Sequence, residues 1–164
     1  MTKFTISLLV ANKHGVLTRV SGLFAKKGYN IDNLSVGKTE NPLYSRMTIV
    51  TECENELIEQ IVNQLEKLVD VKAVMLFDGV KNVSRELMLV KVKSSGQNDG
   101  VIQAVNVFRA KIIDLTPESL IIEITGETDK LDAFLEYLKT FEILEISRTG
   151  LTALQRGKAV INGY

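Results

Sequence analysis

A turn of six residues, Asn12-Lys13-His14-Gly15-Val16-Leu17, separates the first apolar run of the chain from the second. The run before it, residues 4–10, begins with alternating apolar and polar side chains, which is typical of a strand. After it, apolar residues recur at the spacing of one helical face, at Val16, Leu17, Val20, Leu23 and Phe24. We therefore predict a first strand at about residues 3–11 and a first helix at about residues 16–27. This helix should end at Gly28, a natural C-cap.

The beginning of the predicted helix is a candidate ligand site, which we call the helix-start site. The backbone N–H groups of Gly15, Val16 and Leu17 have no partner within the helix, and the positive end of the helix dipole lies there, so the turn attracts a carboxylate. Gly15 has no Cβ and lets a ligand approach closely. Asn12 offers a carbonyl to an ammonium group and an amide to a carboxylate. We interpret the turn as a site for a free amino acid, with Val16 and Leu17 beside the ligand's side chain. The same residues also fit an ordinary tight turn.

The rest of the first half predicts a ferredoxin-like module. Strands are expected at residues 31–39, 44–51 and 71–77, and a second helix begins at about Asn55, a plausible cap. The order β-α-β-β-α-β gives a four-stranded antiparallel sheet with both helices on one face. The other face would be half bare, and pairing with a second copy would cover it or an edge strand. The helix-start site would then lie where two copies meet, with Asn30 and Ile31 coming from the neighbouring chain.

The second half predicts the same order of elements again. A short polar linker at residues 79–84 separates a first domain, residues 1–78, from a second, residues 85–164. The elements of the second domain are expected at residues 86–92, 101–108, 111–115, 119–125, 131–138 and 143–148. We detect no residue-by-residue repeat, so the repetition is one of topology. The predicted fold class is α+β, with two ferredoxin-like βαββαβ modules in tandem.

Composition excludes several classes of function. The chain has 164 residues, and its 20 basic residues equal its 20 acidic ones. A nucleic-acid-binding protein usually has a basic surplus, so we expect no nucleic-acid partner. Cys53 is the only cysteine, which excludes an internal disulfide and a multi-cysteine metal site and fits a reducing compartment. No run of 18 apolar residues is present, so we expect no membrane span and a soluble, cytoplasmic protein.

The sequence predicts no active site of its own. His14 is the only histidine, so no histidine-rich metal cluster can be built, although a contact between His14 and a ligand stays open. Cys53 lies among acidic residues that give no reason for a lowered pKa. No glycine-rich phosphate loop occurs. The pair Lys26-Lys27 fits a helix end, where cations offset the dipole.

Several blocks of the chain occur together in one known family. In the first half they are Ile6–Val10, Asn12–Val20, Gly22–Phe24, Gly28–Ile31, Ser45–Val50 and Lys67–Val71; in the second half they are Arg85–Val92, Phe108–Pro117, Lys130–Phe134, Glu145–Gly150 and Leu154–Gly157. The first set resembles an ACT domain, and both sets in this order resemble the regulatory (small) subunit of acetolactate synthase, also called acetohydroxyacid synthase. Two departures are Ala11, where the family often has an acidic residue, and His14, where it often has proline.

The resemblance implies a non-catalytic subunit without cofactors of its own. Its partner would be a catalytic large subunit that carries thiamine diphosphate, Mg²⁺ and FAD. The small subunit would raise the activity of that partner and confer feedback inhibition by valine, with leucine or isoleucine as alternative effectors. The effector site carries over to Asn12, Gly15, Val16 and Leu17 of one chain and to Asn30 and Ile31 of its neighbour in an ACT homodimer.

Two questions stay open at this point. Arg109 and Asp114 could form a buried ion pair, bind the catalytic partner or face water. A rival interpretation is a free-standing amino-acid-sensing ACT module that regulates another enzyme or a transcription factor. Such a module would share the helix-start site but not the blocks of the second half.

Overall fold

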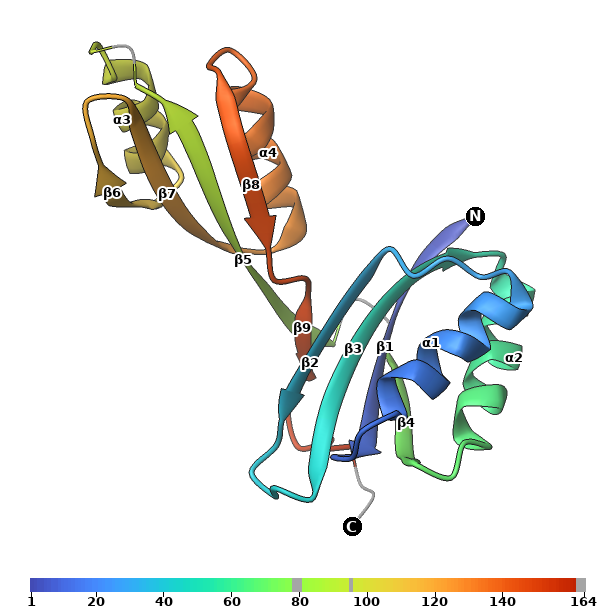
Figure 1. Cartoon of the computed structure of the whole chain (residues 1–164). Helices are drawn as coiled ribbons and strands as arrows, with labels where there is room; N and C mark the ends of the chain where they lie inside the picture. Colours follow the sequence, from blue (N-terminus) through green and yellow to red (C-terminus); the bar gives the residue numbers. More distant parts are fainter. Residues whose placement is uncertain (78–80, 95, 162–164) are drawn as a thin grey trace. The chain divides into compact units, whose positions relative to one another are not determined.

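The structure is a computed structural model of the chain and describes residues 1–77, 81–94 and 96–161. Its internal contacts divide the chain into two compact units. The first unit consists of Met1–Val83 together with the chain from Leu151 onward, and the second consists of Ser84–Gly150. Each unit contains one antiparallel sheet and two helices (Figure 1).

The first unit has the predicted order of elements. They are β1 (Thr2–Ala11), α1 (Val16–Lys27), β2 (Asn33–Lys38), β3 (Tyr44–Cys53), α2 (Asn55–Glu66) and β4 (Val71–Phe77). The sheet has the order β2-β3-β1-β4 with antiparallel pairing throughout, and both helices lie on the same face of it (Figure 1). The predicted ferredoxin-like module is confirmed. Asn55 is the first residue of α2 rather than its cap, which is Glu54.

The core of the first unit lies between this sheet and its helices. Alternate residues of β1, namely Ile6, Leu8 and Val10, belong to one buried cluster with Val20 and Phe24 of α1 and with residues of α2. Full burial of each such side chain contributes about 1.5–3 kcal/mol to folding. Of the apolar residues that predicted the first helix, Val16, Val20 and Phe24 form its buried face, while Leu17 is exposed; α1 begins and ends where the sequence indicated.

The C-terminal segment, residues 151–161, belongs to the first unit, whereas the sequence suggested that it is part of the second domain. The backbone N–H of Leu151 donates to Asn33 Oδ1 at 2.7 Å, and Ser35 Oγ donates to the Leu151 carbonyl at 2.7 Å. The strand β9 (Thr152–Gln155) follows, and the Arg156 N–H donates to the Lys81 carbonyl at 2.6 Å. The segment thus reaches β2 on the face of the sheet that the helices leave open.

The second unit repeats the topology of the first. It contains most of β5 (Asn82–Lys93), then α3 (Asp99–Val107), β6 (Lys111–Leu115), β7 (Ser119–Gly126), α4 (Thr128–Leu138) and β8 (Ile143–Arg148). The main path through its sheet is β6-β7-β5-β8. Strand β5 begins inside the predicted linker at residues 79–84, of which residues 79 and 80 lie outside the described residues.

A buried ion pair holds two strands of the second unit together. The Glu86 side chain is 1 % exposed and accepts two hydrogen bonds from Arg148, at 2.7 and 2.8 Å, and Arg148 also donates to Asp132 at 2.8 Å. The bonds to Glu86 raise the pKa of Arg148. Arg109 and Asp114 are both exposed and form no ion pair with each other in the described part of the chain. The buried ion pair is therefore not made by these two residues.

Two absences hold for the residues that the structure describes. No helix among them is long and apolar enough to cross a membrane. No group of three or more His, Cys, Asp or Glu side chains among them is placed to hold a metal ion.

Candidate functional site

The helix-start site is an uncapped helix N-terminus. Gly15 precedes α1 with φ +81° and ψ −9°, in the left-handed region that favours glycine, and no side chain caps the helix there. The Gly15 carbonyl accepts the Arg19 N–H at 3.1 Å, so the helical pattern begins at this residue. Gly15 is exposed. The N–H groups of the first helical turn therefore need a partner from outside the helix, which is water or an anion.

Arg19 brings a positive charge to the same place. A Cβ built on Gly15 would lie 3.3 Å from Arg19 Nη1, so the guanidinium group lies against the glycine. The other side of the group binds Asp70, with Nε and Nη2 at 2.7 and 2.6 Å from Oδ2. Sequence reasoning missed Arg19 as a site residue. The spacing of four residues between Gly15 and Arg19 could have indicated this position, because long side chains on a helix lean toward its N-terminus.

Asn12 connects the site to the turn between β2 and β3. Its Nδ2 donates to the Pro42 carbonyl at 3.0 Å, and its Oδ1 accepts a hydrogen bond from Ser45 Oγ at 3.2 Å. One N–H and one lone pair of the Asn12 amide are therefore used within the chain. The second N–H and the second lone pair stay available for the predicted contacts to a ligand, which stay a prediction.

Val16 and Leu17 occupy different environments. Val16 is 2 % exposed and packs in the core of the unit, while Leu17 is 45 % exposed. Of the two side chains, only Leu17 offers open apolar surface beside the helix start. Val16 can serve a ligand through its backbone N–H. The adjacent His14 is exposed.

Asn30 and Ile31 lie in the loop between α1 and β2. Asn30 Nδ2 donates to Asp32 Oδ1 at 2.5 Å, and the Asn30 carbonyl accepts the buried Thr51 hydroxyl at 2.6 Å. Ile31 is half-buried and packs against the core. These contacts fix the loop at the beginning of the edge strand β2. The role of both residues in a neighbouring chain's site stays a prediction.

Cys53 has the environment of a structural thiol. It is buried among the apolar residues of the first unit. Burial raises the pKa of this thiol, and the Glu54 carboxylate next to it adds to the rise. At neutral pH the group therefore stays protonated and is a poor nucleophile.

Comparisons with known proteins agree with both halves of the chain. A model of the AHAS small subunit-like ACT domain matches residues 6–73, and a model described as the small subunit of acetolactate synthase matches residues 85–157. The acetolactate synthase small subunit of Mycobacterium bovis is 49 % identical, and the probable one of Methanothermobacter thermautotrophicus is 47 % identical. Both alignments cover 154 residues, 93 % of this chain and 92 % of the relative.

A solved structure shows the same fold over the whole length. The crystal structure of the acetolactate synthase small subunit from Thermotoga maritima aligns with a TM-score of 0.90 and 40 % identity, over 97 % of this chain and 100 % of the other. The matches cover the second half as well as the ACT domain, which the interpretation as a free-standing ACT module does not explain. The chain therefore belongs to the family of the regulatory, small subunits of acetolactate synthase, and its first half is the ACT domain of that family.

Proposed function

We propose that this chain binds a catalytic acetolactate synthase large subunit, raises its activity and makes it sensitive to feedback inhibition by a branched-chain amino acid, with valine as the first candidate. The observation that carries the effector part is the helix-start site. There an uncapped helix N-terminus at Gly15 and the Arg19 guanidinium meet, and both favour a carboxylate.

The charges at the other helices support this choice of site. In the described residues, α2, α3 and α4 each carry an acid in the first turn, Glu56, Asp99 and Asp129 respectively. Helix α1 has none. An acid in the first turn partly offsets the helix dipole, so a ligand carboxylate gains most at α1.

The energies suit a small zwitterion. Charge-assisted hydrogen bonds from the α1 N–H groups and Arg19 are worth about 1.5–3 kcal/mol each before ordering costs. Burial of the valine isopropyl group, in part against Leu17, adds roughly 2 kcal/mol. The ammonium group takes the remaining lone pair of Asn12 Oδ1. After subtraction of the free energy that immobilising the ligand costs, these contributions correspond to an effector that binds reversibly.

A homodimer would complete the site. In the first unit β2 is an edge strand, and exposed edges favour pairing with another chain. Asn30 and Ile31, next to this edge, would then contact the ligand held by the neighbour. A ligand shared by two chains strengthens the dimer, and the dimer strengthens ligand binding by the same factor. Inhibition follows if the liganded dimer favours a less active arrangement of the large subunit.

The large subunit would supply the chemistry, with its thiamine diphosphate, Mg²⁺ and FAD. The present chain would contribute binding and control. Its single, buried thiol is compatible with a reducing compartment, and we place the complex in the cytoplasm.

Reconstitution with the large subunit of the same organism tests the proposal. We expect the added chain to raise the rate of acetolactate formation and to make that rate fall with valine. If neither the rate nor its valine response changes, the proposed function is wrong.

A variant pair locates the effector. Gly15→Asp puts a negative charge and a strained Cβ at the helix start, and we expect calorimetry to show at least a hundredfold weaker valine binding. Gly22→Asp is the matched control on the same helix, because a Cβ there meets nothing within 4 Å. Unchanged valine affinity in Gly15→Asp would exclude the helix-start site while leaving the reconstitution result intact.

A further inference from the structure

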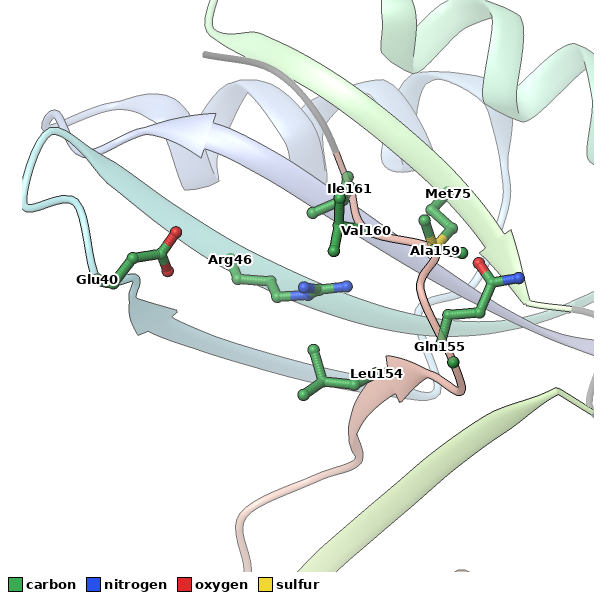
Figure 2. A pocket seen from close by; sticks show the side chains of 9 residues that line it. Glu40, Arg46, Met75, Leu154, Gln155, Ala159, Val160 and Ile161 are labelled. Atoms are coloured by element: carbon green, nitrogen blue, oxygen red, sulfur yellow. The ribbon is translucent and has the colours of Figure 1, made fainter.

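A pocket, which we call the sheet pocket, lies on the helix-free face of the first unit's sheet. It has a volume of about 460 Å³ and is lined by the sheet on one side and by the C-terminal segment on the other (Figure 2). Pockets for small molecules usually have about 300–1,000 Å³. The sheet pocket shares no lining residue with the helix-start site.

The floor of the pocket comes from β3 and β4. In the sheet register, Arg46 pairs with Leu9 and Met75 pairs with Ser7, whereas the alternate residues Ile6 and Leu8 belong to the helix-side core. Arg46 and Met75 therefore point away from the helices. Figure 2 shows the Arg46 side chain extending along the floor, with Val160 and Ile161 on one side of it and Leu154 on the other.

Arg46 is held in position by the sheet. Its Nε donates to Ser7 Oγ at 2.8 Å, and Ser7 is fully buried (0 % exposed). A guanidinium group that is fixed in this way loses little freedom when it binds a carboxylate, which it matches with two parallel N–H groups. A ligand carboxylate would join or replace the contacts that Arg46 makes within the chain.

The other walls of the pocket select the rest of the ligand. Met75, Leu154 and Val160 give an apolar surface, and both Leu154 and Val160 are exposed in the free chain. A short aliphatic tail would cover them. Glu40 lines one end of the pocket (Figure 2), and its carboxylate disfavours a second negative charge on the ligand.

We propose that the sheet pocket binds a small monocarboxylate with a short aliphatic tail, with Arg46 on its carboxylate and Met75, Leu154 and Val160 around its tail. A 2-amino acid and a 2-oxo acid share this chemistry. The occupied pocket would hold the C-terminal segment on the sheet, because a ligand that touches both stabilises their contact. The site does not depend on valine binding at the helix start.

Methionine methyl NMR on the full chain tests this site with isovalerate as the probe. Met75 lines the pocket, while Met47 lies in the helix-side core and Met88 in the second unit, so these two signals are internal controls. The Met75 signal is assigned with Met75→Leu. We expect isovalerate to shift it saturably without moving the controls. The uncharged 3-methylbutan-1-ol should bind at least tenfold more weakly. A comparison of the affinities of valine and 3-methyl-2-oxobutanoate shows whether the pocket prefers a 2-amino acid or a 2-oxo acid.

Three variants decide whether the pocket itself is responsible. Arg46→Met should weaken isovalerate binding at least tenfold. Val160→Trp should fill the pocket and do the same without touching the Ser7 contact. Val69→Trp is the matched control, because Val69 is 87 % exposed and does not line the pocket, and it should bind as the unmodified chain does.

Several results would overturn the proposal. They are an unmoved Met75 signal, equal affinity for the alcohol, unchanged binding in Arg46→Met or Val160→Trp, and joint shifts of all methionine signals. A Met75 shift that depends on protein concentration without ligand would instead identify this face as a contact between two copies and would also overturn it.

Discussion

The first helices of the two units have the same place in the topology but begin in different ways. Helix α1 follows a left-handed glycine, has no acid in its first turn and has the Arg19 guanidinium beside its N-terminus. Helix α3 begins after Asn98, whose side chain donates to Ser94 Oγ at 3.0 Å, and carries Asp99 in its first turn. The second unit therefore has an acid in the first turn of this helix, whereas the first unit has none there and its Asp70 carboxylate binds the Arg19 side chain instead.

The glycines near these two helix starts also serve different purposes. Gly15 is needed for its positive φ. At Gly100, in α3, the question is one of space, because a Cβ there would lie 2.8 Å from the far end of the Phe141 ring and the ring would have to shift. Two modules with the same order of elements thus use glycine at their first helices for different physical reasons.

The largest expected effect concerns the internal charges of the second unit. Glu86→Ala removes the buried partner of Arg148, and we expect it to lower the free energy of unfolding by about 3 kcal/mol, near the lower end for a broken buried pair because Arg148 keeps Asp132 and some solvent. Urea denaturation measures this loss. Glu127→Ala breaks the exposed pair with Arg85 and should cost less than about 0.5 kcal/mol. Equal losses in the two variants would show that the second unit does not depend on its buried charges.

A smaller effect is expected for the charge beside the first unit's helix. Arg19→Met should weaken valine binding about tenfold, or about 1.4 kcal/mol, because it removes a cation next to the ligand carboxylate. Asp70→Asn keeps that cation and is the control, with affinity expected within threefold of the unmodified chain. Calorimetry gives both affinities, and a greater loss in Asp70→Asn than in Arg19→Met would contradict the assigned role.

The smallest effect is expected for a substitution that makes the beginning of α1 resemble that of α3. Thr18→Glu places an acid in the first turn of α1, at an exposed position. We expect it to stabilise the chain by about 0.3–1 kcal/mol through the helix dipole and to weaken valine binding about fivefold. Thermal unfolding and calorimetry measure the two changes. A variant that binds valine more tightly would break the comparison between the two helix starts.

Local patterns were sufficient to predict most of the fold. The apolar spacing from Val16 to Phe24 and the glycine at position 28 predicted the bounds of α1, because burial and capping act over a few residues. The C-terminal segment was assigned differently because its contacts are not local. Leu151 meets Asn33 at a separation of 118 residues, and no periodicity in either stretch indicates that pairing.

The candidate site was predictable in part. The start of the helix directly after Gly15 followed from the apolar helix face that begins at Val16, whereas the left-handed conformation of Gly15 was not predicted. The burial of Val16 follows from the same face, so its side chain could have been assigned to the core. The position of Arg19 beside Gly15 follows from their spacing of four residues, and it was overlooked. The contacts of Asn12 depend on the hairpin that Pro42 and Ser45 occupy, which forms only when distant strands come together.

The return of the chain to its first unit makes the second unit an insertion rather than a successor. A fragment that stops at residue 83 would lack the segment over Arg46 and Met75 and would expose that face of the sheet to water. Joining residue 83 directly to residue 151 through a short glycine-rich bridge would restore that segment. The first unit is therefore discontinuous in sequence, and deletions meant to isolate it should remove the middle of the chain instead of its end.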